Sequence, residues 1–165
     1  MNKNLSDSII GVCQILNKHS VEYLIVGGAA VALFGYFRLS TSMAGKPSEK
    51  QDLDFWYNPT YTNYFRLLDA LEELGQNVSD YKREKTPNPK KSFFKFEDEK
   101  FTLDFLPELK SLSSFITAYK KREIARLIDI EIPFIGFDDL IKDKEANSRP
   151  KDKIDIEQLK IRRSR

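Results

Sequence analysis

Residues 49–65 read "EKQDLDFWYNPTYTNYF", and within this stretch the acids Asp52 and Asp54 stand on either side of Leu53. The apolar and aromatic residues that follow are typical of a strand that enters a hydrophobic core. Successive side chains on a strand point to opposite faces, so we expect Asp52 and Asp54 to share one face, about 7 Å apart. Two acids placed in this way repel each other unless a positive charge lies between them. Such a pair alone is common at solvated edges, so the rest of the chain has to decide its role.

A second acidic strand is predicted at residues 101–107, "FTLDFLP". Asp104 is flanked there by apolar residues, in a setting where an acid without a partner is costly. If this strand neighbours the strand at 52–57, all three aspartates can converge on one site. Oxygen-rich sites of this kind suit Mg²⁺ or Mn²⁺, which proteins bind through a few carboxylates together with substrate phosphates.

A glycine pair interrupts the segment "VGGAAVALFG" at residues 26–35. Gly27 and Gly28 follow an apolar β-rich run and precede strong helix formers, so they predict a strand-to-helix turn whose backbone N–H groups could bind an anion. The segment lacks both the G-x-G-x-x-G pattern of dinucleotide-binding turns and the G-K-[ST] ending of a P-loop. Close packing alone would also explain such a turn.

Composition excludes several classes of protein. The 165 residues are close to the usual size of one domain, and we expect residues 1–165 to form a single domain. The net charge of +2 indicates neither a nucleic-acid nor a membrane partner by itself. A single cysteine, Cys13, excludes an internal disulfide and is expected in the core, and a single histidine, His19, leaves little material for histidine-based zinc sites or a Ser-His-Asp triad. Without a signal-like or membrane-spanning apolar run, we expect a cytoplasmic protein.

The predicted order of elements begins with helix, strand, helix, strand, helix, and strands dominate afterwards. This order predicts an α+β (mixed α/β) fold with a central mixed sheet and helices packed on it. The expected elements are a helix at 5–19, a strand ending at 26, a helix ending near 35, a strand at 52–57, a helix ending near 74, hairpins at 91–109 and 122–135, and two helices within 137–163 that are separated at Pro150.

Four segments, in this order, resemble the polymerase-beta-type nucleotidyltransferase superfamily, and in particular its small bacterial AbiEii-like and minimal nucleotidyltransferase groups. They are "YLIVGGAAVALFGYFR" at 23–38, "DLDFW" at 52–56, "FTLDFLP" at 101–107 and "LIKDKEANSRPKDKIDIEQL" at 140–159. Together they cover most of the chain. The resemblance implies the nucleotidyltransferase fold and transfer of a nucleoside monophosphate from an NTP to a hydroxyl group, with release of pyrophosphate and two Mg²⁺ ions on the entering and leaving oxygens.

The resemblance also implies roles for individual residues. Gly27 and Gly28 would hold the phosphates of the nucleotide, and Asp52 and Asp54 would bind the metal ions. Asp104 would help to hold the second metal and would orient or deprotonate the acceptor hydroxyl.

Two further cations, Arg38 and Lys144, are candidates by resemblance for contacts to phosphate. Gly28 stands where many relatives have serine, a change that the motif permits. Residues 39–51 form a longer insertion after Arg38 than relatives carry, and we expect a loop there that could cover the pocket. The acceptor would be a small molecule, a tRNA or a protein.

Other functions stay open at this stage. The chain could instead be a catalytically weak binding module that acts as an antitoxin-like partner of another protein. Its aromatic residues could then form an interface, although ordinary core packing is the expected role of Trp56, Tyr57, Tyr61 and Tyr64. The basic segment 82–95 and the basic tail from Arg149 onward are expected to be solvated, or else to form a rim that attracts a phosphorylated ligand. Nucleic-acid binding through 82–95 is a further option. A glycosidase that uses Asp52 and Asp54 as acid and base is disfavoured, because two acids on one strand face do not flank a sugar.

Overall fold

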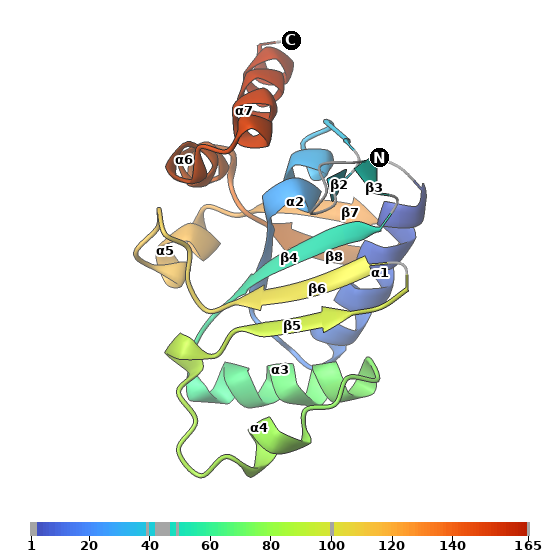
Figure 1. Ribbon diagram of the computed structural model, residues 1–165, viewed down its shortest axis with the longest axis vertical. Coiled ribbons are helices and arrows are strands. Elements are labelled where there is room, and N and C mark those ends of the chain that lie inside the picture. Colours follow the sequence, from blue (N-terminus) through green and yellow to red (C-terminus); the bar gives the residue numbers. More distant parts are fainter. Residues whose placement is uncertain (1–2, 39, 42–46, 49, 100, 165) are drawn as a thin grey trace.

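A computed structural model describes residues 3–38, 40–41, 47–48, 50–99 and 101–164 of the chain (Figure 1). Its centre is a six-stranded mixed sheet with the strand order β5-β6-β4-β1-β8-β7. Neighbouring strands are parallel in the pairs β4–β6 and β1–β8 and antiparallel in the other three pairs. The strands are β1 (Tyr23–Val26), β4 (Gln51–Tyr57), β5 (Phe94–Glu97), β6 (Phe101–Leu106), β7 (Glu123–Leu127) and β8 (Ile130–Phe134). The predicted mixed α/β class and both predicted hairpins are confirmed.

Helices surround this sheet, with α1, α3 and α4 toward one side in Figure 1 and α2, α6 and α7 toward the other. The helices are α1 (Lys3–Lys18), α2 (Gly27–Leu33), α3 (Tyr61–Glu73), α4 (Ser79–Arg83), α5 (Phe115–Lys120), α6 (Phe137–Asn147) and α7 (Pro150–Arg163), with a 3-10 turn η1 at Pro89–Lys91. Within the described ranges, each helix is too short or too polar to cross a lipid bilayer.

Alternation along β4 divides its side chains between the two faces of the sheet. Leu53, Phe55 and Tyr57 are buried on the face that packs on α1 and α3, and the ring of Phe55 stacks on Phe105 of β6 with centroids 4.8 Å apart. Asp52 and Asp54 occupy the other face, because the side-chain period of a strand is two. The burial of the apolar set thus determines which face the acids occupy.

The aromatic residues of 49–65 mostly belong to the core. Trp56, Tyr57 and Tyr64 are buried, which confirms the expected role, whereas Tyr61 on α3 is 62% exposed. Cys13 is buried as expected.

Some elements were not predicted. The six-residue helix α5 follows β6, α4 occupies the start of the basic segment, and a two-stranded ladder of β2 (Ser40–Thr41) and β3 (Pro47–Ser48) lies within the 39–51 insertion. Residues 39, 42–46 and 49 of that insertion lie outside the described residues, and so does most of the loop expected to cover the pocket.

Candidate active site

The parallel pairing of β4 with β6 brings the predicted acids together. In its register Asp54 lies opposite Asp104, and Asp52 lies opposite Thr102, whose hydroxyl donates a hydrogen bond of 2.8 Å to Asp52 Oδ1. Equivalent positions on neighbouring strands point to the same face. The predicted neighbourhood of the two acidic strands is therefore confirmed, and all three aspartates lie on the face opposite α1 and α3.

The turn at Gly27 lies directly against this acidic face. β1 pairs with β4 so that Val26 lies opposite Asp54, and Gly27 follows with a φ of 63°, in the left-handed region that favours glycine. A Cβ atom at position 27 would overlap Oδ2 of Asp54. Glycine is therefore required here both by the backbone conformation and by the close approach of the carboxylate.

Burial and mutual repulsion change the acidity of these carboxyl groups. Burial, and then the charges of Asp104 and Asp52, raise the pKa of Asp54 to about 6. The pKa of Asp104 is also raised, first by burial, while Lys95 on the neighbouring strand opposes the shift. Oδ1 of Asp104 is buried and lacks a hydrogen-bond partner among the described residues. The site therefore carries negative charge that the nearby lysines, Lys144 and Lys151 beside Asp54 and Lys95 beside Asp104, offset only in part.

A cavity of about 60 Å³ lies beside Asp54 and collects most of the predicted site. Its lining includes Gly27, Gly28, Arg38, Asp52, Asp54 and Lys144 from the predicted set, together with Arg149 and Lys151. Asp104 is not part of this lining and instead lies on the adjacent strand.

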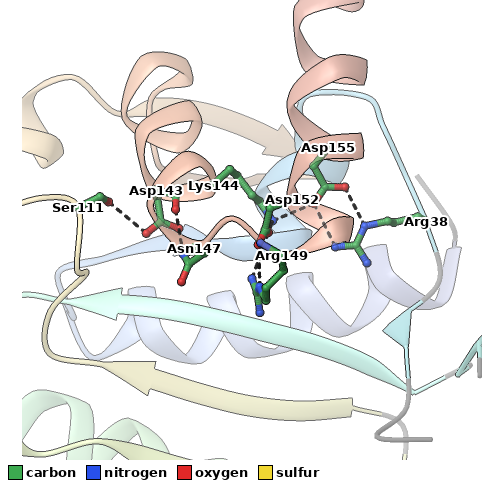
Figure 2. A network of polar contacts seen from close by, with 8 residues as sticks. All are labelled: Arg38, Ser111, Asp143, Lys144, Asn147, Arg149, Asp152 and Asp155. Atoms are coloured by element: carbon green, nitrogen blue, oxygen red, sulfur yellow. Dashed lines mark hydrogen bonds and ion pairs between the residues drawn. The ribbon is translucent and has the colours of Figure 1, made fainter. Parts of the chain in front are cut away.

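A network of ion pairs holds the cations of this cavity (Figure 2). Arg38 donates two hydrogen bonds to Asp155 of α7, at 2.8 and 3.0 Å. Lys144 of α6 is only 1% exposed, and its ammonium group contacts Asp152 at 3.1 Å and Asp155 at 2.8 Å. Arg149 donates to Asp152 at 2.7 and 3.1 Å. Arg38 and Lys144 thus line the cavity as predicted, but both are already paired with buried carboxylates.

Lys151, which was not predicted as a site residue, differs from the cations around it. It is half-buried, and the ion pairs recorded between described residues do not include it. Its pKa is lowered by burial and by the nearby charges of Arg149, Arg38 and Lys144. A cation in this situation gains most from an added anion. The signal for Lys151 and Arg149 was present in the segment 140–159, but local sequence does not show which cations are already neutralised.

The donor chemistry of the acidic face fits a hard divalent cation. Carboxylate oxygens come from Asp52, Asp54 and Asp104, and the partnerless Oδ1 of Asp104 is among them. Within the ranges that the structure describes, however, no three His, Cys, Asp or Glu side chains are gathered closely enough to hold a metal ion by themselves. Mg²⁺ is usually bound by one or two carboxylates plus substrate phosphates, so this arrangement suits a metal that arrives with its nucleotide.

The sequence and the fold were compared with those of known proteins. No family model matches the chain, and no curated protein matches it by sequence. Among solved structures, the lincomycin-bound lincosamide antibiotic adenylyltransferase LnuA superposes with a TM-score of 0.59 at 17% identity, over 97% of this chain and 96% of that one. The chain has the nucleotidyltransferase fold.

Two further structures agree. An antigenic nucleotidyltransferase-like protein from Paracoccidioides brasiliensis has a TM-score of 0.57 at 13% identity, over 96% of this chain and 74% of that one. The antibiotic-resistance factor ANT(2'')-Ia has a TM-score of 0.57 at 16% identity, over 98% of this chain and 84% of that one. Membership of the AbiEii-like group stays a prediction.

Proposed function

We propose that the protein is a Mg²⁺-dependent nucleotidyltransferase that moves a nucleoside monophosphate from an NTP to a hydroxyl acceptor. The observation that carries this proposal is the register of β4 and β6, which pairs Asp54 with Asp104 beside the Gly27 turn. The raised pKa of Asp54 supports it, because such a carboxyl group is stabilised as an anion once a cation binds. The shared fold with LnuA is consistent with this chemistry.

Each part of the site has a task in the proposed reaction. The metal, when bound, would neutralise charge on the phosphates and on the entering and leaving oxygens. Gly27 and Gly28 allow the backbone to approach the triphosphate closely. Lys151 supplies positive charge near Asp52 and Asp54 without an ion pair among the described residues, while Arg38, Lys144 and Arg149 keep the wall of the cavity in place.

Asp104 is the proposed base. The acceptor oxygen attacks the α-phosphorus, the bond from this phosphorus to the bridging oxygen breaks, and pyrophosphate leaves. The proton of the acceptor hydroxyl passes to the carboxylate of Asp104, whose raised pKa makes it a better proton acceptor than an ordinary aspartate. Asp104 is only partly buried, so an acceptor hydroxyl can approach its carboxylate from the acidic face of the sheet.

The binding-module alternative is less well supported by the site. An antitoxin-like partner protein would not need a carboxylate whose charge is left without compensation, since such a group destabilises the fold. The aromatic residues that could have formed its interface are mainly in the core.

The proposal is tested by thermal unfolding with ATP, GTP, CTP and UTP, each with and without Mg²⁺ or Mn²⁺. A nucleotide at 100 times its dissociation constant should stabilise the wild type by about 2.7 kcal/mol, and only when the metal is present. Asp54→Asn should lose this shift, whereas Asp129→Asn, the same chemical change in the exposed β7–β8 turn, should keep it. Absence of a metal-dependent shift with every NTP would overturn the enzymatic proposal.

A further inference from the structure

A second hollow adjoins the cavity beside Asp54. It has a volume of about 570 Å³ and shares Gly27, Asp54 and Arg149 with the first cavity. A third hollow, of about 880 Å³, continues from it across Lys90 and the residues 107–110. A groove therefore leads away from Asp54 along the carboxyl end of β6, and Lys151 does not line it.

The walls of this groove carry three lysines. Lys90 and Lys91 come from η1, and Lys110 comes from the segment after β6; we call this the lysine groove. The ion pairs found among described residues include none of these three side chains, whereas Lys82, in the same basic segment, pairs with Asp69 and Glu72.

The acids that face the groove offset the lysines only in part. Glu108 is exposed on the rim, and Asp54 lies at the inner end, where the proposed metal would neutralise it. Asp143 of α6 accepts a hydrogen bond of 3.2 Å from Ser111 (Figure 2), and burial raises its pKa. The floor is apolar and includes Phe93, which is 45% exposed, and Leu106.

Both segments that carry the lysines are anchored to the elements of the active site. The hydroxyl of buried Tyr57, on the strand of Asp52 and Asp54, donates to the carbonyls of Pro89, at 2.7 Å, and Ser92. On the other wall, Trp56 Nε1 donates to the carbonyl of Pro107 at 3.3 Å, and Ser111 binds α6 through Asp143. The backbone that carries the lysines is therefore held in a fixed position relative to Asp54, which a merely solubilising basic loop would not require.

We propose that the lysine groove binds the acceptor and selects one that carries a phosphate group, bound by Lys90 and Lys110 while its hydroxyl lies beside Asp104 and Asp54. This inference rests on the proposed function and names the class of its second substrate. An apolar floor with a basic wall suits a sugar phosphate or the terminal nucleotide of a nucleic acid, and disfavours a polycationic acceptor, since the lysines would repel it.

The test uses the reactivity of individual lysines in the full chain. Lysines are acetylated with a limiting reagent, and the rate at each position is read by peptide mass spectrometry. The probes are ribose 5-phosphate, its matched control ribose, a short oligoribonucleotide and Mg²⁺ with the preferred NTP. Lys120 and Lys153, which are exposed and line none of the three hollows, serve as internal controls.

We expect ribose 5-phosphate, but not ribose, to slow the acetylation of Lys90 and Lys110, by about tenfold at ten times its dissociation constant. Protection by the oligoribonucleotide alone would also support a phosphorylated acceptor and would assign it to a nucleic-acid end. If Lys90 and Lys110 are acetylated at the same rate with and without ribose 5-phosphate and the oligoribonucleotide, the inference is overturned. If Mg²⁺–NTP protects Lys151 in the same experiment, the proposed nucleotidyltransferase function is retained and only the phosphorylated acceptor is rejected. If Mg²⁺–NTP protects no lysine, both proposals are rejected.

A second measurement follows transfer of label from the NTP to ribose 5-phosphate or the oligoribonucleotide, whichever protects. The double variant Lys90→Gln/Lys110→Gln should raise the KM for this acceptor at least about tenfold and leave the KM for the NTP unchanged. The variant Lys120→Gln/Lys153→Gln should match the wild type. An unchanged acceptor KM in the first variant would contradict the inference.

Discussion

Two groups of aspartates in this small protein, a buried pair on α7 and the acids of β4 and β6, differ in how their charge is compensated. Asp152 and Asp155 of α7 face cations: burial would raise the pKa of each, but the hydrogen bonds of Arg149, Arg38 and Lys144 outweigh it and hold both pKa values below the usual range. Asp54 on the sheet faces two other acids, and its pKa is raised to about 6. The charges of the α7 aspartates are thus compensated by cations of the protein, whereas the charge of Asp54 is compensated only in part.

The largest effect on stability is expected from removing the cation that pairs with Asp152 and Asp155. Lys144→Met leaves Asp152 and Asp155 buried without the ammonium that they share, which should lower the free energy of unfolding by about 3–5 kcal/mol. Chemical denaturation at neutral pH measures this loss. Lys142→Met, on the exposed face of the same helix, should stay within about 0.5 kcal/mol of the wild type. Similar values for the two variants would show that the network does not hold α6 on α7.

Removing the charge of Asp54 should instead raise the free energy of unfolding. Between pH about 4 and about 6 the folded chain binds the proton of Asp54 more tightly than the unfolded chain does, so this group lowers stability as pH rises through that window. Asp54→Asn should therefore raise the free energy of unfolding at pH 7.5 by up to about 3 kcal/mol in the absence of ligand. The gain should shrink as pH falls through that window and vanish near pH about 3, below the unfolded pKa of 3.8, where Asp54 is protonated in both states. A pH-independent difference would mean that packing, and not charge, separates the variant from the wild type.

The close approach of Gly27 to Asp54 should make position 27 intolerant of any side chain. Gly27→Ala places a side chain in a left-handed backbone conformation and against Oδ2 of Asp54, which should destabilise the fold by about 1–2 kcal/mol. Gly11→Ala on α1, where an added Cβ meets no neighbour, is the matched control and should be neutral or slightly stabilising. Combining Gly27→Ala with Asp54→Ala should recover part of the loss if the overlap is its cause.

Lys151→Gln should have the smallest effect on stability, within about 0.5 kcal/mol, because this lysine lacks an ion pair among the described residues. Its effect should appear in the affinity for Mg²⁺–NTP, which we expect to fall at least about tenfold with the loss of a charge-assisted contact to phosphate. Titration calorimetry measures it, and Lys153→Gln on the same helix is the control. Equal affinities in the two variants would remove Lys151 from the nucleotide site.

The elements that carry the acids could be predicted because their signals are local. The alternation of Asp52, Leu53 and Asp54 predicts a strand face without knowledge of any other residue, and so does the apolar setting of Asp104. Placing them on one face of the sheet needed only one assumption, that the two strands are neighbours, which the pairing of β4 and β6 confirms. The helix α5 has six residues, too few for a periodic pattern to emerge.

The roles of the cations could not be predicted in the same way. Arg38 and Asp155 are 117 positions apart, and nothing near either residue indicates that they meet. Arg38 and Lys144 were predicted as phosphate contacts from resemblance, and both line the cavity, but the sequence does not reveal that each is already bonded to a carboxylate. For the same reason Lys151 was not singled out within the basic tail from Arg149, since it differs from its neighbours only in lacking an ion pair among the described residues.

The position of these cations along the chain has a consequence for synthesis on the ribosome. The sheet, its three aspartates and the Gly27 turn are encoded in the first 134 residues, whereas Lys144, Arg149 and Lys151 arrive only with α6 and α7. A nascent chain therefore exposes a complete set of acids before any cation of those helices can reach them. Until α7 leaves the exit tunnel and Asp155 meets Arg38, the cavity beside Asp54 lacks the wall that Lys144, Arg149 and Lys151 provide.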